Sequence, residues 1–168
     1  IYEALEKIKE KKLIQKSGIS IYSPDELDLI CGNYTFDIVQ SPFNIIDQRL
    51  YLSGWLNKLK VQGVEVHVRS AFLQGLLLIP LHEIPVYFSP WENYFIAWKS
   101  WLEEKSLLPV EGCLAFIKKF SDISYLLVGA DNSSHLNEII SAFKKTEAND
   151  FPEIFSSDEK LINPSLWK

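Results

Sequence analysis

Residues 64–78, with the sequence VEVHVRSAFLQGLLL, decide the fold. The first part alternates Val64, Val66 and Val68 with polar residues, and this two-residue period of β-branched side chains predicts a β-strand. The second part is small and polar and contains Gly75, whose backbone can take conformations closed to other residues and can approach a ligand closely. Because α/β proteins bind ligands at the carboxyl ends of their strands, we expect a strand that leads into a ligand site. A strand and a loop without a ligand would fit the same residues.

Length and composition limit what the chain can be. With 168 residues it is long enough for one domain with a hydrophobic core, but short for a closed (β/α)8 barrel of about 250 residues. The net charge of −5 comes from acidic and basic residues mixed along the chain, so no nucleic-acid partner and no membrane partner are expected. No apolar run approaches the ~20 residues of a membrane span. We therefore expect a cytoplasmic protein.

The first residue and the two cysteines lead to further expectations. The sequence begins at Ile1 without an initiator methionine, which suggests a fragment or a processed product. Cys31 and Cys113 lie far apart and form no Cys-x-x-Cys pair, so we expect two reduced, packed thiols rather than a disulfide. The spacing of cysteines and histidines predicts no metal site.

The other patterns alternate between helix and strand. Helices are predicted over residues 1–12, 23–32, 47–62, 91–104 and 109–120 and from Ser133 or Ser134 onward, and strands over 14–21, 36–40, 64–69 and 124–129. Such alternation favours parallel strands joined by right-handed helical crossovers. Residues 147–168 read as an acidic, polar tail whose Leu166 and Trp167 fold back on the domain.

Three helices carry apolar faces that predict how they pack. One face of helix 47–62 holds Leu52, Trp55, Leu56 and Leu59. The last helix is expected to face the core with Leu136, Ile139, Ile140 and Phe143. Helix 91–104 carries an aromatic stripe of Trp91, Tyr94, Phe95, Trp98 and Trp101. Packing against the outer wall of the domain is the simplest role of this stripe; a wall of a substrate pocket and a subunit contact are the alternatives.

Four segments, in order, resemble the C-terminal half of the aldo/keto reductases. Residues 16–20 (KSGIS) resemble the fifth strand of that family, and residues 36–44 (FDIVQSPFN) resemble the sixth. Residues 64–78 resemble the seventh strand with its loop, and residues 126–138 (LLVGADNSSHLNE) resemble the eighth strand and the start of the next helix. The resemblance implies an α/β fold of the (β/α)8 TIM-barrel family, in which residues 1–146 supply four parallel βα units and residues 147–168 form the tail.

The resemblance also implies where an NAD(P)(H) cofactor binds at its nicotinamide end. Ser20 and Gln40 match the positions that hold the carboxamide, although Ser20 could instead make a local turn bond, and Ile21 replaces the usual Asn. Arg69 matches a position where the family often has an aromatic residue stacked on the nicotinamide. A guanidinium can also stack there and would favour the neutral, reduced ring; Arg69 could equally pair with a carboxylate.

The other end of the cofactor is implied in the same way. The loop that wraps the pyrophosphate matches Ser70, Phe72, Gln74 and Gly75. The adenosine end matches Gly129, Asp131, Asn132, His135 and Glu138. Residues 129–135 contain no Lys or Arg to hold the 2′-phosphate of NADP, so NAD is expected to be tolerated or preferred. The alternative is that a basic residue of the missing half or of the tail, such as Lys160 or Lys168, reaches that phosphate.

The resemblance assigns no catalytic residue in this chain. The Asp, Tyr, Lys and His of the family come from the first four strands, and His67 is predicted to be a wall residue. The implied activity is NAD(P)H-dependent reduction of a small aldehyde or ketone, with residues 1–168 inactive alone. A non-catalytic nucleotide-binding or protein-interaction module derived from the barrel is the alternative.

Half a barrel also has consequences for assembly. Four parallel strands leave two open edges, and we expect an apolar inner face beside them. The expected partner is therefore the missing N-terminal half-barrel or a homo-oligomer partner.

Overall fold

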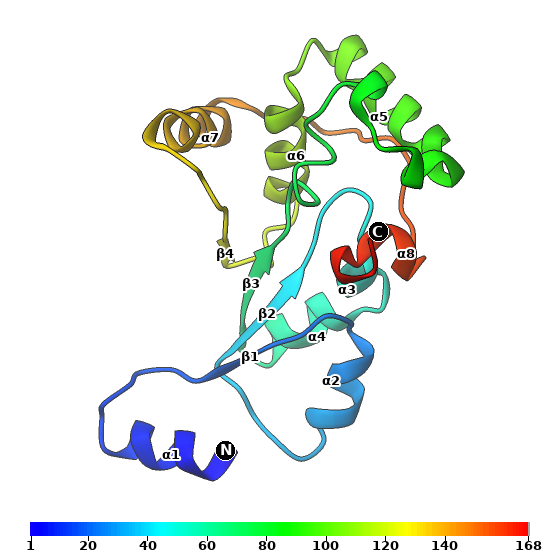
Figure 1. Ribbon diagram of the computed structural model, residues 1–168. Coiled ribbons are helices and arrows are strands. Elements are labelled where there is room, and N and C mark those ends of the chain that lie inside the picture. The colour runs from blue at the N-terminus through cyan, green and yellow to red at the C-terminus, as the bar shows by residue number, and fades with distance from the viewer. Residues whose placement is uncertain (168) are drawn as a thin grey trace.

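The framework of the protein is a four-stranded parallel sheet in a computed structural model that describes residues 1–167 (Figure 1). The strands lie side by side in chain order: β1 (Gly18–Ser20), β2 (Ile38–Pro42), β3 (Glu65–Arg69) and β4 (Tyr125–Leu126). In the register, Ser20 lies opposite Gln40, Gln40 opposite His67, and His67 opposite Tyr125. Among the described residues β1 and β4 each have a single neighbour, so both edges of the sheet are open. The predicted α/β half-barrel is confirmed.

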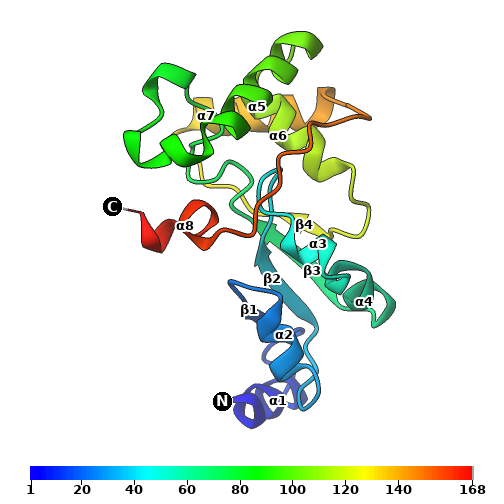
Figure 2. The same cartoon turned by 90° about the vertical axis from the view of Figure 1, so that its right-hand side faces the viewer.

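The helices are α1 (Tyr2–Glu10), α2 (Asp25–Ile30), α3 (Arg49–Leu52), α4 (Trp55–Val61), α5 (Glu92–Lys105), α6 (Pro109–Lys118), α7 (Ser133–Lys145) and α8 (Glu159–Ile162). Short 3-10 helices cover Leu81–Glu83, Val86–Trp91 and Pro164–Leu166. In both views α5, α6 and α7 lie together at the end of the molecule toward which β3 points, and α1 and α2 lie at the other end (Figures 1 and 2). No helix within residues 1–167 is long and apolar enough to cross a membrane.

The two faces of the sheet differ in polarity. Val66 and Val68 are fully buried on the side that the helices cover, because this is the face where β3 meets other apolar side chains. Glu65, His67 and Arg69 alternate with them and point to the opposite face, where they are only partly buried. On β3 the expectation of an apolar inner face is therefore wrong, because the valines of this strand face the helices.

Several predicted bounds also need correction. The helix expected over residues 47–62 is two helices, because Gly54 has a left-handed backbone (φ 79°) that ends α3 before α4 begins. Trp55, Leu56 and Leu59 are buried as expected, whereas Leu52 falls on the exposed side of the break. β1, β3 and β4 are shorter than predicted, whereas β2 keeps the predicted five residues but begins and ends two residues later than residues 36–40.

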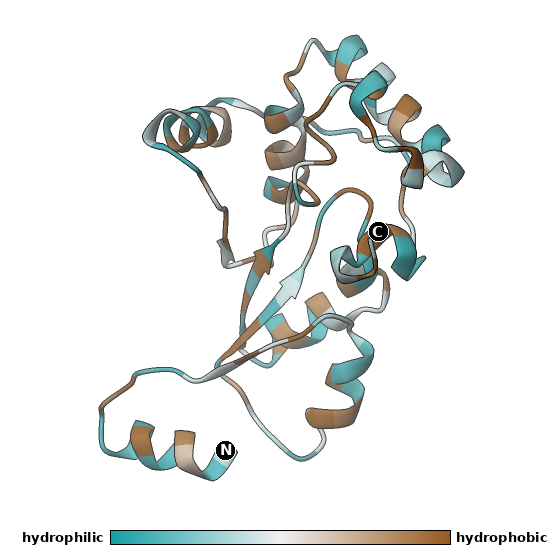
Figure 3. Cartoon of the chain, in the orientation of Figure 1, coloured by the Kyte–Doolittle hydropathy of each residue, from teal (hydrophilic) through white to brown (hydrophobic). Residues whose placement is uncertain are grey.

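The apolar face of α7 is largely uncovered, contrary to expectation. Leu136, Ile140 and Phe143 are 43%, 42% and 40% exposed, and Ala142 is the buried residue of the helix. Figure 3 shows both hydrophobic and hydrophilic residues around α7, as expected for an amphipathic helix. The helix packs on α6 along one side only, because β4 has no further strand beside it within residues 1–167.

The aromatic stripe of α5 packs into the core, as the simplest reading predicted. Phe95 and Trp98 are buried, and the Trp98 ring stacks on the Trp101 ring at a centroid distance of 5.2 Å. The tail also folds back: the Trp167 ring meets the Phe88 ring edge-on at 4.9 Å. The two cysteines are free, and burial raises the pKa of the Cys31 thiol and, more strongly, that of Cys113.

Candidate functional site

A cleft of about 880 Å³ opens where β3 and β4 end. Its walls are the loop after β3, the segment between β4 and α7, and the first turns of α7. The residues predicted to hold a cofactor that line it are Arg69, Ser70, Phe72, Gln74, Gly75, Gly129, Asp131, His135 and Glu138. Ser20, Gln40 and Asn132 do not line the cleft. The fold thus brings together two segments that lie about sixty residues apart in the sequence, as parallel strands with neighbouring carboxyl ends should.

The loop after β3 has an unusual backbone. Ser70 (φ 62°), Leu73 (φ 47°), Gln74 (φ 54°) and Gly75 (φ 85°) all have left-handed conformations. Such a backbone turns successive N–H groups outward, and an anion is a suitable acceptor for them. The N–H groups of Phe72 and Gln74 have no backbone acceptor within the described part of the chain. Gly75 signalled this loop in the sequence, but no residue type indicated the conformations of Leu73 and Gln74.

Buried polar contacts hold this loop in place. The Asn44 side chain donates from Nδ2 to the Ser70 carbonyl oxygen at 3.1 Å. Its Oδ1 accepts from the backbone N–H groups of Ile46 and Asp47, each at 2.9 Å. At the far end of the loop, Trp98 Nε1 donates to the carbonyl oxygen of Leu77 at 3.0 Å. Sequence reasoning assigned no role to Asn44, because its partner is 26 residues away.

The N-terminus of α7 forms the opposite wall. Asn132 caps this helix, with Oδ1 accepting from the His135 N–H at 2.9 Å, so the predicted cap at Ser133 or Ser134 is wrong. Asp131 is 95% exposed, and its Oδ2 lies 3.7 Å from His135 Nδ1. Free N–H groups and the helix dipole favour negative charge at such an N-terminus.

Lys160 does not join this wall. It lies in α8, on the opposite side of the molecule from α7 in Figure 1. Lys168, the other suggested contact to a 2′-phosphate, lies outside the described residues.

Two further predicted residues, Ser20 and Gln40, lie side by side on neighbouring strands. Ser20 is the last residue of β1, whereas Gln40 lies in the middle of β2, because β2 continues to Pro42. Ser20 Oγ donates to Gln40 Oε1 at 3.3 Å, so these two side chains lie together on the polar face of the sheet. His67 lies opposite Gln40 on the next strand, with its Nε2 3.3 Å from Glu65 Oε2. Its ring packs against the Tyr125 ring in a T-shaped arrangement, so the side chain forms part of the wall of the sheet. Within residues 1–167 no group of three potential metal ligands comes together.

Arg69 makes contacts other than those anticipated. Its guanidinium donates to the carbonyl oxygen of Ile21 at 3.2 Å and to Ser70 Oγ at 3.4 Å. The Tyr22 ring lies over it, with 4.9 Å between the ring centroid and Cζ. No carboxylate of residues 1–167 forms an ion pair with Arg69, so the alternative of a paired arginine is not realised in this part of the chain.

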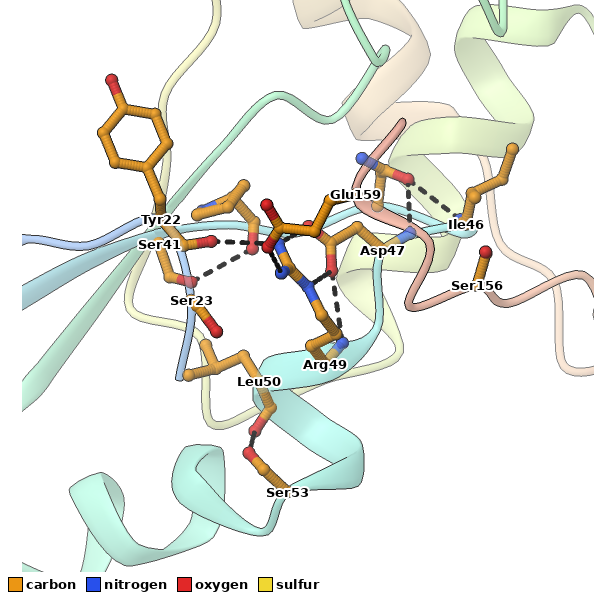
Figure 4. A network of polar contacts seen from close by, with 12 residues as sticks. Tyr22, Ser23, Ser41, Ile46, Asp47, Arg49, Leu50, Ser53, Ser156 and Glu159 are labelled. Atoms are coloured by element: carbon orange, nitrogen blue, oxygen red, sulfur yellow. Dashed lines mark hydrogen bonds and ion pairs between the residues drawn. The ribbon is translucent and has the colours of Figure 1, made fainter. Parts of the chain in front are cut away.

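A second arginine, Arg49, forms a network of polar contacts just beyond the carboxyl ends of β1 and β2 (Figure 4). Arg49 binds both carboxylate oxygens of buried Asp47, at 2.9 and 3.0 Å, and also donates to the Tyr22 carbonyl oxygen at 2.9 Å and to Glu159 at 3.2 Å. Burial lowers the pKa of Arg49, but the hydrogen bonds and charges of Asp47 and Glu159 outweigh burial and raise the pKa overall. This network joins the exits of β1 and β2 to the C-terminal tail, and sequence reasoning missed it.

The fold is that of half a parallel (β/α) barrel, with a cleft at the carboxyl ends of β3 and β4. A model of the aldo/keto reductase family matches residues 1–159, and the chain belongs to this family.

Solved structures show the same fold. The aldo-keto reductase AKR11C1 from Bacillus halodurans matches with a TM-score of 0.70 in both its holo and its apo form. The holo form is 20% identical, and the match covers 88% of this chain and 51% of that chain. The apo form is 21% identical, and the match covers 99% of this chain and 56% of that chain. The thermostable aldo-keto reductase Tm1743, in complex with the inhibitor epalrestat, matches with a TM-score of 0.63 and 15% sequence identity. The match covers 88% of this chain and 49% of that chain. The chain therefore spans about half the length of these structures. No curated protein matches it.

Proposed function

We propose that this chain supplies the cofactor-binding half of an NAD(P)H-dependent aldo/keto reductase that reduces an aldehyde or a ketone. The observation that carries this proposal is the 880 Å³ cleft, in which the loop after β3 faces the N-terminus of α7. Both elements present N–H groups suited to phosphate oxygens, so the cleft suits a ligand with a central pyrophosphate.

The residues around the cleft fit such a cofactor. The left-handed backbone at Gln74 and Gly75 would wrap the pyrophosphate, and Asp131 and His135 would meet the adenosine end. Ser20 and Gln40 would hold the carboxamide, since together they offer a hydroxyl and an amide on neighbouring strands. When bound, the cofactor supplies the hydride; these side chains bind and orient it.

The carbonyl substrate and the groups that act on it belong to the other half of the barrel in this proposal. The chain spans about half of the family structures that it matches, so whole-enzyme turnover would need the first four strands. In solution this part of the protein is expected to bind a reduced dinucleotide without oxidising it.

Two measurements test the proposal. The first is the binding of NADH and NADPH, from quenching of tryptophan fluorescence, to residues 1–168 and to the protein as its gene encodes it. The second is oxidation of the reduced cofactor with a panel of aldehydes and ketones. Binding with turnover in the intact protein, and no turnover by residues 1–168, supports the proposal. Binding without any turnover in the intact protein favours the non-catalytic module, and absence of binding overturns both.

A further inference from the structure

An exposed aromatic ring stands beside the polar ends of the strands. Tyr22 lies two residues after the end of β1, is 62% exposed, and contacts the guanidinium of Arg69 with its ring. The same arginine lines the cleft. Tyr22 therefore adjoins the cleft through Arg69, and it follows Ser20 by two residues, although it was not among the predicted site residues.

The backbone of Tyr22 is held although its ring is exposed. Its N–H donates to Glu26 Oε1 at 2.7 Å, and its carbonyl oxygen accepts from Arg49 Nη2 at 2.9 Å. One residue earlier, the Ile21 carbonyl oxygen accepts from Arg69. In Figure 4 the ring points away from the Arg49 network. A large apolar ring that is fixed at its base and open to solvent is pre-organised to contact a ligand, because little conformational freedom remains to be lost.

The positive charge of Arg69 has no negatively charged partner among the described residues. Its described contacts are a carbonyl oxygen, a hydroxyl and an aromatic face, none of which carries a negative charge. A flat guanidinium with one side on a tyrosine ring can stack on a second flat group with its other side. That second group is attracted if it is neutral and rich in electrons, and repelled if it carries a positive charge.

We propose that Tyr22 and Arg69 form a stacked pair at the nicotinamide end of the bound cofactor, which selects the reduced over the oxidised ring, and that Arg49 is the positioning residue that holds Tyr22 in this pair. The inference rests on the proposed function. The oxidised nicotinamide is a cation and the reduced ring is neutral, so the open charge of Arg69 discriminates between them.

The test is the ratio of the dissociation constants for the oxidised and the reduced cofactor, measured by calorimetry on the intact protein. The wild type is expected to bind the reduced form about tenfold more tightly, within the range of a cation beside an aromatic ring. Arg69→Met keeps the bulk without the charge and should bring the two constants close together. Tyr22→Leu should lower the ratio by about threefold, whereas Tyr22→Phe keeps the ring and should preserve it. Tyr51→Leu, on an exposed tyrosine of α3 outside the cleft, is the matched control.

The role of Arg49 has its own pair of variants. Arg49→Lys keeps a positive charge beside Asp47 but loses the planar fork that reaches the Tyr22 carbonyl oxygen, so it should lower the ratio as Tyr22→Leu does. Glu159→Gln loosens the tail while leaving the Arg49–Tyr22 bond, and should leave the ratio unchanged. Chemical unfolding of each variant separates a change in ratio from a loss of fold.

The outcomes separate the two proposals. If the wild type binds neither form, the proposed function fails. If it binds both forms and Arg69→Met and Tyr22→Leu leave the ratio unchanged, the stacked pair is refuted while the cofactor site stands. An effect of Glu159→Gln equal to that of Arg49→Lys would refute the positioning role.

Discussion

The Asn44 side chain connects the exit of β2 to the first residue of the cleft loop, by donating to the carbonyl oxygen of Ser70. Both oxygen and nitrogen of its amide are used, since Oδ1 accepts two backbone N–H groups. Asn44→Ala would leave the buried N–H groups of Ile46 and Asp47 without this acceptor, and would remove one of the two donors to the Ser70 carbonyl oxygen, which still accepts from the Leu73 N–H at 3.0 Å. The change should cost about 2–3 kcal/mol in the free energy of unfolding.

Asn44→Asp makes this prediction specific. The carboxylate still accepts the two N–H groups but has no donor for Ser70, so hydrogen exchange at Leu73 and Gly75 should accelerate more than global stability falls. Asn57→Ala on the exposed side of α4 serves as the control. An Asn44→Asp protein with wild-type exchange at the loop would contradict this role of Asn44.

Gly112 lets α6 approach α5 closely. A Cβ at this position would lie 2.6 Å from Leu102 Cδ2 and 2.7 Å from Trp98 Cη2. Alanine normally gains about 1 kcal/mol over glycine inside a helix, but overpacking costs about 1–3 kcal/mol, so Gly112→Ala should destabilise the protein on balance. Gly32→Ala, where a Cβ meets nothing within 4 Å, should change stability by less than about 0.5 kcal/mol in urea unfolding. A more stable Gly112→Ala protein would show that the aromatic stripe can shift.

The sequence predicted the parts of the fold that have local signals. The alternation in β3 and the glycine after it indicated a strand that ends at a site, and the cleft lies there. Apolar spacing predicted an apolar face on α7, but spacing does not say what covers such a face, and here most of it is open. A periodic pattern predicts that one helix or strand has an apolar face, whereas the burial of that face depends on whether another helix or strand packs against it.

The residues that sequence reasoning missed depend on distant partners. Asn44 acts on Ser70, and Arg49 acts on Tyr22 and on Glu159, which is 110 residues away. Neither residue type is unusual in a loop or a helix. Their roles follow only from the parallel register, which brings the exits of neighbouring strands to one edge of the sheet.

Asp37 ties α1 to the sheet and should make stability depend on pH. The hydrogen bond from Lys9 (2.6 Å), and then that from the Ser17 N–H (2.9 Å), lower the pKa of Asp37. A lowered pKa in the folded state stabilises the protein above the unfolded pKa of about 4, and this contribution is lost as pH falls through the folded pKa. The free energy difference between wild type and Asp37→Asn in urea should therefore be largest near neutral pH and shrink in acid. Glu153→Gln, at an exposed carboxylate, should show no such trend; a pH-independent gap for Asp37→Asn would rule out the ion pair as its cause.

The open edges predict self-association of residues 1–168. β1 and β4 have unpaired edges within the described chain, and the exposed Leu136, Ile140 and Phe143 add apolar surface beside β4. Ile140→Glu should shift the association measured by ultracentrifugation toward monomer. Leu29→Glu, on exposed α2, introduces the same charge elsewhere and should not. A wild-type chain that sediments as a monomer and unfolds cooperatively would contradict this prediction.

Asp131 is expected to set the choice between NADH and NADPH in the intact protein. It is exposed at the N-terminus of α7 and lines the cleft, where Arg69 is the one Lys or Arg among the described lining residues. A 2′-phosphate with up to about two negative charges would be repelled by Asp131, whereas ribose hydroxyls can donate to its carboxylate. We expect kcat/KM for NADPH to exceed that for NADH by far less than a hundredfold, or to fall below it. Asp131→Arg should shift the preference toward NADPH, with Asp150→Arg, an exposed carboxylate that does not line the cleft, as the charge-matched control. A wild-type preference for NADPH of about a hundredfold, equivalent to ~2.7 kcal/mol, would show that another residue holds the phosphate and that Asp131 does not govern the choice.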